Sequence, residues 1–195
     1  MNPINHFELN RPVHLARRDA CFERAVKLIS DQREAQGGDL QIGDYEEILL
    51  LLRTARQHAH FSIRNVGRNE HDEQFSLFIN LLAGNVKAVL SMINLKGMVE
   101  KSQGSSFGFL GVNQASAGLQ AEEYHRRAND IVRSMQNTLS LASEPFENLK
   151  QENRKTASAE DNQRYEKALG HFERLAEEKQ ATRRIPSIIR RFMRV

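Results

Sequence analysis

The stretch at residues 75–95 most constrains the fold of this chain. Its large apolar side chains follow one another in steps of three and four, which places them on one face of an α-helix. They are Phe75, Phe78, Ile79, Leu82, Val86, Val89, Leu90 and Ile93. We therefore expect a central helix that ends near Lys96, before Gly97, and organises a helical core. Gly84 lies inside this helix, where it costs about 1 kcal/mol relative to alanine, and a close helix crossing would explain it.

Polar residues within that stretch argue against a membrane-spanning helix, because each is costly to bury in hydrocarbon. They are Asn80, Asn85, Lys87 and Asn94. Residues 1–12 contain no apolar segment of the kind that secretory signals need. Cys21 is the only cysteine, so no disulfide can form within the chain. We therefore expect an intracellular protein, cytoplasmic or nuclear, with peripheral membrane attachment as a second option.

Apolar periodicity and helix-boundary signals predict an all-α protein with about six helices. Besides the central helix, we expect helices near residues 13–36, 44–65, 119–141 and 158–182, and one that begins at Ser143-Glu144-Pro145. Proline at 145 favours a helix start there, because its fixed backbone angle suits a first turn. Ser158 and Asp161 have the spacing of an N-cap and its partner, so we expect the last helix to begin at this pair.

Residues 101–118 divide the chain, because Gly, Ser, Asn and Gln dominate them. We therefore expect a helical bundle in two subdomains joined by this flexible, Gly/Ser-rich loop. The N-terminal subdomain, at 1–100, holds the central helix, and the C-terminal subdomain lies at 119–182. Residues 183–195 follow as a basic amphipathic tail.

The tail at 183–195 holds five arginines and no acidic residue, so without it the formal net charge would fall from +3 to −2. Arginine makes paired hydrogen bonds to phosphate. The anion-binding candidates are Arg183, Arg184, Arg190, Arg191 and Arg194 in the tail, with Arg17 and Arg18 on the first helix. The candidates for insertion into a membrane are Ile188, Ile189, Phe192 and Met193. The expected partner is an anionic membrane or a nucleic acid, and a terminus docked on its own domain is the alternative.

Phe107, Phe109 and Leu110 are unusual inside a loop of small polar residues. A solvated linker has little use for such side chains. We expect them to pack against a second copy of the chain or a groove in the first half, with packing against their own subdomain as the alternative. A homo-oligomer follows from the first interpretation, and the 104–111 loop is also a candidate contact for another protein.

Residues 53–58 read RTARQH, which places His58 five positions after Arg53. This spacing resembles the Arg-x4-His motif of HEPN ribonucleases, helical domains in which paired Arg and His serve RNA cleavage at a dimer interface. The resemblance implies that His58 transfers a proton and that Arg53 stabilises charge on the phosphate. It covers these residues alone, and Thr54 stands where the family commonly has Asn.

The sequence contains no GxGxxG or Walker-type phosphate loop and no HExxH motif. The histidines lack zinc-site spacing, so we expect no metal and no cofactor. The favoured function is a non-enzymatic helical assembly or scaffolding protein, similar in general character to viral matrix or nucleoprotein-associated proteins. It would self-associate and bind an anionic surface through its arginines. The alternatives are a HEPN-like ribonuclease that uses Arg53 and His58, and a protein–protein adaptor or effector with an inert tail.

Overall fold

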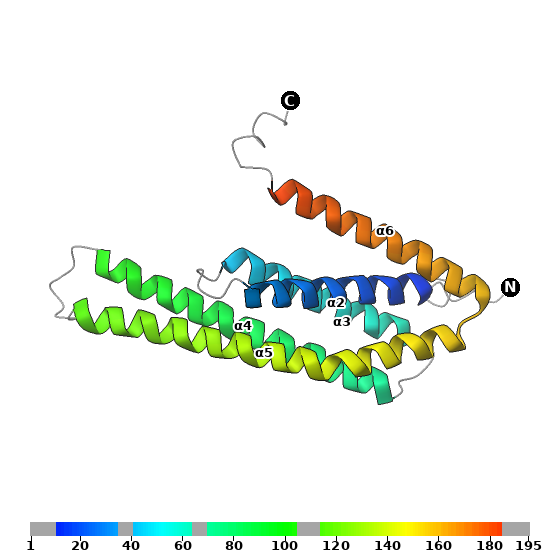
Figure 1. Cartoon of the computed structure of the whole chain (residues 1–195), viewed down its shortest axis with the longest axis horizontal. Helices are drawn as coiled ribbons and strands as arrows, with labels where there is room; N and C mark the ends of the chain where they lie inside the picture. Colours follow the sequence, from blue (N-terminus) through cyan, green and yellow to red (C-terminus); the bar gives the residue numbers. More distant parts are fainter. Residues whose placement is uncertain (1–10, 35–40, 64–69, 105–113, 185–195) are drawn as a thin grey trace, which may run out of the picture.

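The computed structural model describes residues 11–34, 41–63, 70–104 and 114–184. Their regular secondary structure is helical throughout, so the protein is all-α, as the sequence predicts. In chain order the helices are α2 (Arg11–Glu34), α3 (Ile42–Ile63), α4 (Glu70–Gly104), α5 (Gln114–Thr156) and α6 (Ala159–Arg184). Figure 1 shows α4 and α5 as a long antiparallel pair, with α2 and α3 packed along part of its length and α6 outermost.

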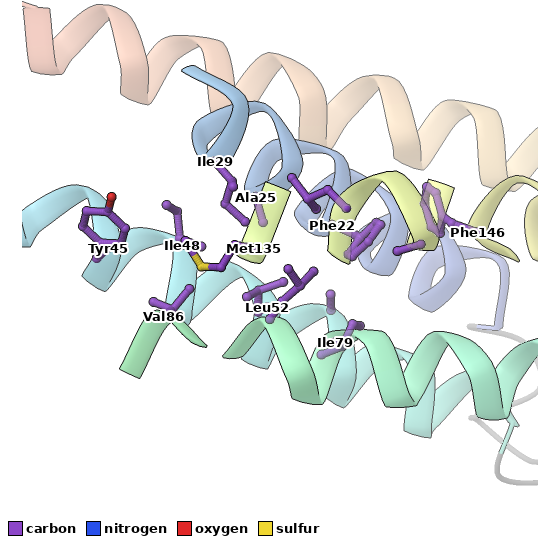
Figure 2. Close-up of a cluster of buried hydrophobic side chains, with 14 of the residues drawn as sticks. Phe22, Ala25, Ile29, Tyr45, Ile48, Leu52, Ile79, Val86, Met135 and Phe146 are labelled. Carbon is purple, nitrogen blue, oxygen red and sulfur yellow. The ribbon is translucent and has the colours of Figure 1, made fainter. Parts of the chain in front are cut away.

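One large cluster of buried side chains from α2, α3, α4 and α5 forms the core (Figure 2). Its aromatic members include Phe22 of α2, Phe75 of α4 and Phe146 of α5, whose ring centroids lie 4.6 to 5.4 Å apart. The predicted stripe of the central helix is confirmed on its buried side by Phe75, Ile79, Leu82, Val86 and Val89. Phe78, Leu90 and Ile93 are partly buried against the same cluster. Burial of each large side chain contributes roughly 1.5–3 kcal/mol.

The same cluster contains residues from both sides of the 101–118 segment. Val132, Met135 and Leu149 of α5 are buried together with Ile48 and Leu52 of α3. In the described residues, the two halves of the chain therefore share one core.

Two predicted helix boundaries near the middle of the chain are wrong. α4 continues through Gly97 to Gly104, and α5 begins at Gln114, so residues 101–104 and 114–118 are helical. A glycine inside a helix costs only about 1 kcal/mol. The contacts of Ile93 with the core and of α4 with α5 offset that cost. Figure 1 shows these ends of α4 and α5 projecting beyond α2 and α3.

The helix predicted to start at Ser143-Glu144-Pro145 is not separate, and this lowers the helix count to five in the part of the chain that the structure describes. Pro145 lies inside α5, where it lacks the N–H that would bond the carbonyl of residue 141. Ser143 donates its hydroxyl to the carbonyl of Leu139 at 2.9 Å. Phe146 and Leu149 beyond the proline are buried in the core. Their packing keeps the helix continuous against the local preference of proline.

α6 begins at the predicted cap. The backbone N–H of Asp161 donates to the Ser158 hydroxyl oxygen at 3.1 Å, which satisfies one of the unpaired donors of the first turn. Tyr165 packs with Leu15 and Ala16 of α2 in a second, smaller cluster, where Leu169 and Phe172 are partly buried. α6 is therefore held mainly by the beginning of α2, and Figure 1 shows its later turns diverging from the other helices.

Candidate functional site

The sequence places Arg18 on a charged surface, but the structure places it in the interior. Its side chain is 0% exposed, and its Nε donates to Asp19 Oδ1 at 2.6 Å. Tyr165 donates its hydroxyl to the other carboxylate oxygen of Asp19 at 2.8 Å. The expectation that Arg18 binds an external anion is therefore corrected: Arg18 belongs to a buried polar network that ties α2 to α6.

Not every hydrogen-bond donor of this network has an acceptor among the described residues. Arg18 Nη1 and Nη2 are buried and have no hydrogen-bond partner among the described residues. The guanidinium lies 5.3 Å from the centroid of the Phe75 ring, which offers a cation–π contact in their place. Desolvation, together with the Asp19 charge and hydrogen bond, raises the pKa of Tyr165, so its phenol stays protonated. We assign the network a structural role, because all three side chains are buried and they link α2 to α6.

Arg17 differs from its neighbour, because its side chain is exposed on α2. Its guanidinium lies 5.4 Å from the centroid of the Phe172 ring of α6. Of the two candidates on the first helix, Arg17 is the one that remains accessible to an anion.

Arg53 and His58 of the HEPN-like motif lie on α3, but in different environments. Arg53 is exposed, and His58 is half-buried. The Nδ1 atom of His58 lies 2.8 Å from Nδ1 of His14 on α2, so one neutral ring donates to the other. Burial, the Arg17 charge and the His14 charge lower the pKa of His58 to about 4. His58 is thus neutral near pH 7 and already bonded within the chain.

A small cavity of about 60 Å³ lies between α2, α5 and α6, and its charged groups are largely paired. Arg11 donates to Asn153 Oδ1 at 3.1 Å, and Lys150 donates to Glu23 Oε1 at 2.7 Å. This volume holds only a few waters. The cavity therefore suits hydration of the α5–α6 corner better than binding of a substrate.

A wider hollow of about 550 Å³ lies where α4 and α5 project. Its charged lining residues are Lys96, Glu100, Glu122, Arg126, Asp130 and Arg133. Since acidic and basic groups balance along it, the hollow has no net preference for an anion.

The outer face of α4 is an exposed, mainly apolar surface that the sequence analysis missed. We use this name for Leu77, Leu81, Gly84, Ala88, Ser91, Leu95 and Met98. Leu77, Leu81 and Met98 are 57%, 49% and 67% exposed. By length and composition, the helix segment at 70–101 is apolar enough to cross a membrane, and 22% of its 18-residue apolar window is buried. A second apolar stripe, opposite the core stripe, was the signal available in the sequence.

Gly84 lies in the middle of this outer face. A Cβ atom added there would meet nothing within 4 Å in the described structure. The close crossing expected at Gly84 is therefore not formed among the described residues. Among the described residues, no neighbouring atom lies close enough to require glycine rather than a larger residue at position 84.

The remaining candidates lie outside the described residues. They are Phe107, Phe109, Leu110, Ile188, Ile189, Arg190, Arg191, Phe192, Met193 and Arg194. Arg183 and Arg184 end α6, but their side chains are not among those described. The loop and tail hypotheses therefore stay predictions.

Comparison of the chain with protein-family models, with curated proteins and with solved structures finds no match.

Proposed function

We propose that this protein is a non-enzymatic helical assembly or scaffolding protein that self-associates and contacts an anionic surface. The exposed outer face of α4 is the observation that carries the proposal. Monomeric soluble proteins rarely leave a long contiguous apolar surface uncovered, and such surfaces usually mark an interaction site. In α4 the apolar residues exceed what the core covers, because Leu77, Leu81, Leu95 and Met98 are exposed.

Contact with an anionic surface is the second part of the proposal. Arg17 is exposed, and the arginines of 183–195 add a local positive charge. Arginine is the side chain best suited to phosphate groups. The linker at 101–118, with Phe107 and Phe109, would add contacts between copies. The division into two subdomains is not confirmed, because one core cluster contains residues from both sides of this segment.

Two measurements on the full chain test the proposal. Light scattering after gel filtration should give a mass above the 22.3 kDa of one chain, and the mass should rise with concentration. Flotation with anionic vesicles, beside an RNA shift assay, should show salt-sensitive binding that is lost on deleting residues 183–195. A chain that is monomeric at every concentration, with no binding to either anion, contradicts the proposal.

The ribonuclease alternative has a distinct test. RNA cleavage that disappears in His58→Ala and Arg53→Ala would support it. The half-buried, neutral His58 bonded to His14 must first leave that partner to serve as a proton donor. An adaptor is favoured instead if the protein binds neither itself nor an anion but forms a tight complex with another protein.

A further inference from the structure

We propose that the outer face of α4 binds the same face of a second copy of this chain, with the two α4 helices antiparallel. This inference rests on the proposed self-association, and it names the surface, the partner and the register. It replaces neither the loop nor the tail hypothesis, which concern other residues.

The spacing of the outer face is that of a coiled-coil seam. Its members recur in steps of four and three over residues 77–98, which is a seven-residue repeat. The buried residues of α4, such as Phe75, Leu82 and Val89, follow the same repeat on the opposite side of the helix. A helix with two apolar seams is typical of one that packs against its own bundle on one side and a further helix on the other.

The side chains of the outer face are large at its ends and small at its centre. Leu77 and Leu81 lie at one end, Leu95 and Met98 at the other, and Gly84, Ala88 and Ser91 lie between them. Two identical helices can pair about a two-fold axis only if the surface complements its own reversal. This order of sizes allows it, because reversal can place Gly84 against Ala88 at the centre and Leu77 against Leu95 towards the ends, with Ser91 against Leu81 between them.

The centre of the face also suits close approach of two backbones. Gly84 has open space where its Cβ would be, and Ala88 lies one turn further along the same face. Ser91 donates its hydroxyl to the carbonyl of Lys87 at 3.0 Å within its own helix. Its polar group is therefore satisfied without water, which removes a cost of burying it.

Charge at the two ends of α4 selects the antiparallel direction. The first turn carries Glu70, Asp72 and Glu73, whereas Lys101 lies in the last turn. Glu73 and Lys101 are both exposed, on the same edge of the outer face. A parallel pair would place the acidic first turns of both copies at the same end of the dimer. An antiparallel pair places Glu73 opposite the other copy's Lys101, twice per dimer.

One register satisfies these conditions together. When Glu73 lies opposite Lys101 of the second copy, the heptad pairs Gly84 with Ala88 and Leu77 with Leu95. The contact then runs for about 43 Å, since each helical residue rises about 1.5 Å. The same register places Lys87 beside Lys87 of the second copy at the two-fold axis, on the exposed edge, where the two long side chains can turn apart into water.

A matched pair of glycine variants tests the proposal in the full chain. Gly84 and Gly97 both lie in α4, and a Cβ at either would meet nothing within 4 Å. Gly97 is off the outer face. Gly84→Gln and Gly97→Gln should both leave the protomer at least as stable, because glutamine is the better helix former. Only Gly84→Gln should weaken the dimer, by at least tenfold in its dissociation constant measured by sedimentation.

Cysteine cross-linking tests direction and register. In a Cys21→Ala background, chains with Leu77→Cys are mixed with chains with Leu95→Cys under mild oxidation. The antiparallel register predicts 77–95 heterodisulfides and no 77–77 disulfide, because disulfides need Cα atoms about 4.4–6.8 Å apart. A dominant 77–77 product would overturn the antiparallel arrangement.

The outcomes separate this inference from the proposed function. A wild-type oligomer that Gly84→Gln leaves unchanged overturns the α4 interface but not self-association. A wild-type chain that is monomeric at all concentrations overturns both. Vesicle binding by a monomeric chain, lost in Leu77→Gln with Leu95→Gln, would overturn the inference and assign the outer face to a membrane.

Discussion

Asp19 is the residue on which the link between α2 and α6 depends. Its two carboxylate oxygens accept from Arg18 Nε and the Tyr165 hydroxyl, and all three side chains are buried. A buried charge without its partner is costly. Removing one of these three side chains should therefore lower the free energy of unfolding by more than the free energy of the lost hydrogen bond.

Two tyrosines provide a matched test of this network. Tyr165→Phe removes a donor to Asp19 and should lower the free energy of unfolding by about 1–3 kcal/mol. Tyr45 is also buried, but its hydroxyl has no partner among the described residues. Tyr45→Phe should therefore be neutral or stabilising. Urea denaturation of both variants measures the difference, and equal losses would contradict the assigned role of the Tyr165 hydroxyl.

The His14–His58 contact predicts a pH dependence of stability. The pKa of His58 is about 4 in the folded chain, below its ordinary value of 6.5. Between these two pH values, His58 binds a proton in the unfolded chain but not in the folded chain. The free energy of unfolding should therefore fall as pH drops from about 6.5 towards 4. Solvent screening limits the loss to about 1 kcal/mol between pH 6.5 and 5.

His58→Phe and the exposed His60→Phe allow the slope to be assigned. Urea denaturation at several pH values should show a flatter profile for His58→Phe and an unchanged profile for His60→Phe. A wild-type slope in both variants would mean that other groups cause the acid sensitivity.

For single residues, periodicity predicted which hydrophobic side chains of α4 are buried. It did not predict whether adjacent charged side chains are buried or exposed. Arg17 and Arg18 are the same residue type in adjacent positions, yet one is exposed and one is buried. They point about 100° apart on the helix, and which direction faces the interior depends on where α6 and Phe75 pack. The sequence alone contains no signal for the Asp19–Tyr165 bond, which joins residues 146 positions apart.

At the scale of the helix, local boundary signals are weaker than tertiary packing. Gly97 and Pro145 were both interpreted as boundaries, and both lie inside continuous helices. Where buried residues lie on both sides, as Ala142 and Phe146 do around Pro145, core contacts exceed the local cost. By contrast, the Ser158 cap was predicted correctly, because its chemistry is contained within a few residues.

Pro145→Ala should stabilise the protein by about 1 kcal/mol or more, because it restores a helical N–H donor and relieves the clash with the preceding turn. Thermal and urea unfolding would measure this gain. Glu144→Ala, next to it and exposed, is the control and should change little. A loss of stability in Pro145→Ala would instead show that Phe146 needs the local bend that proline imposes.

At the scale of the whole molecule, composition and periodicity were sufficient for the all-α class, but not for how the halves combine. The low-complexity segment at 101–118 suggested a division, whereas the core cluster unites α2 and α3 with α5. The linker-like composition of residues 101–118 describes only that segment of the chain. Whether the elements on either side share a core depends on which faces meet, and that information is spread over the entire sequence.

A chain split within 105–113 tests the shared core. Fragments 1–109 and 110–195 should each unfold without a cooperative transition, because Phe22 and Phe75 lie in one fragment and Phe146 in the other. Equimolar mixing should restore helical circular dichroism and a cooperative urea transition. Phe146→Ala in the second fragment should weaken this recovery strongly, since truncating a core phenylalanine costs about 3–5 kcal/mol. Cooperative unfolding of 110–195 alone, unaffected by mixing, would instead support two independent subdomains.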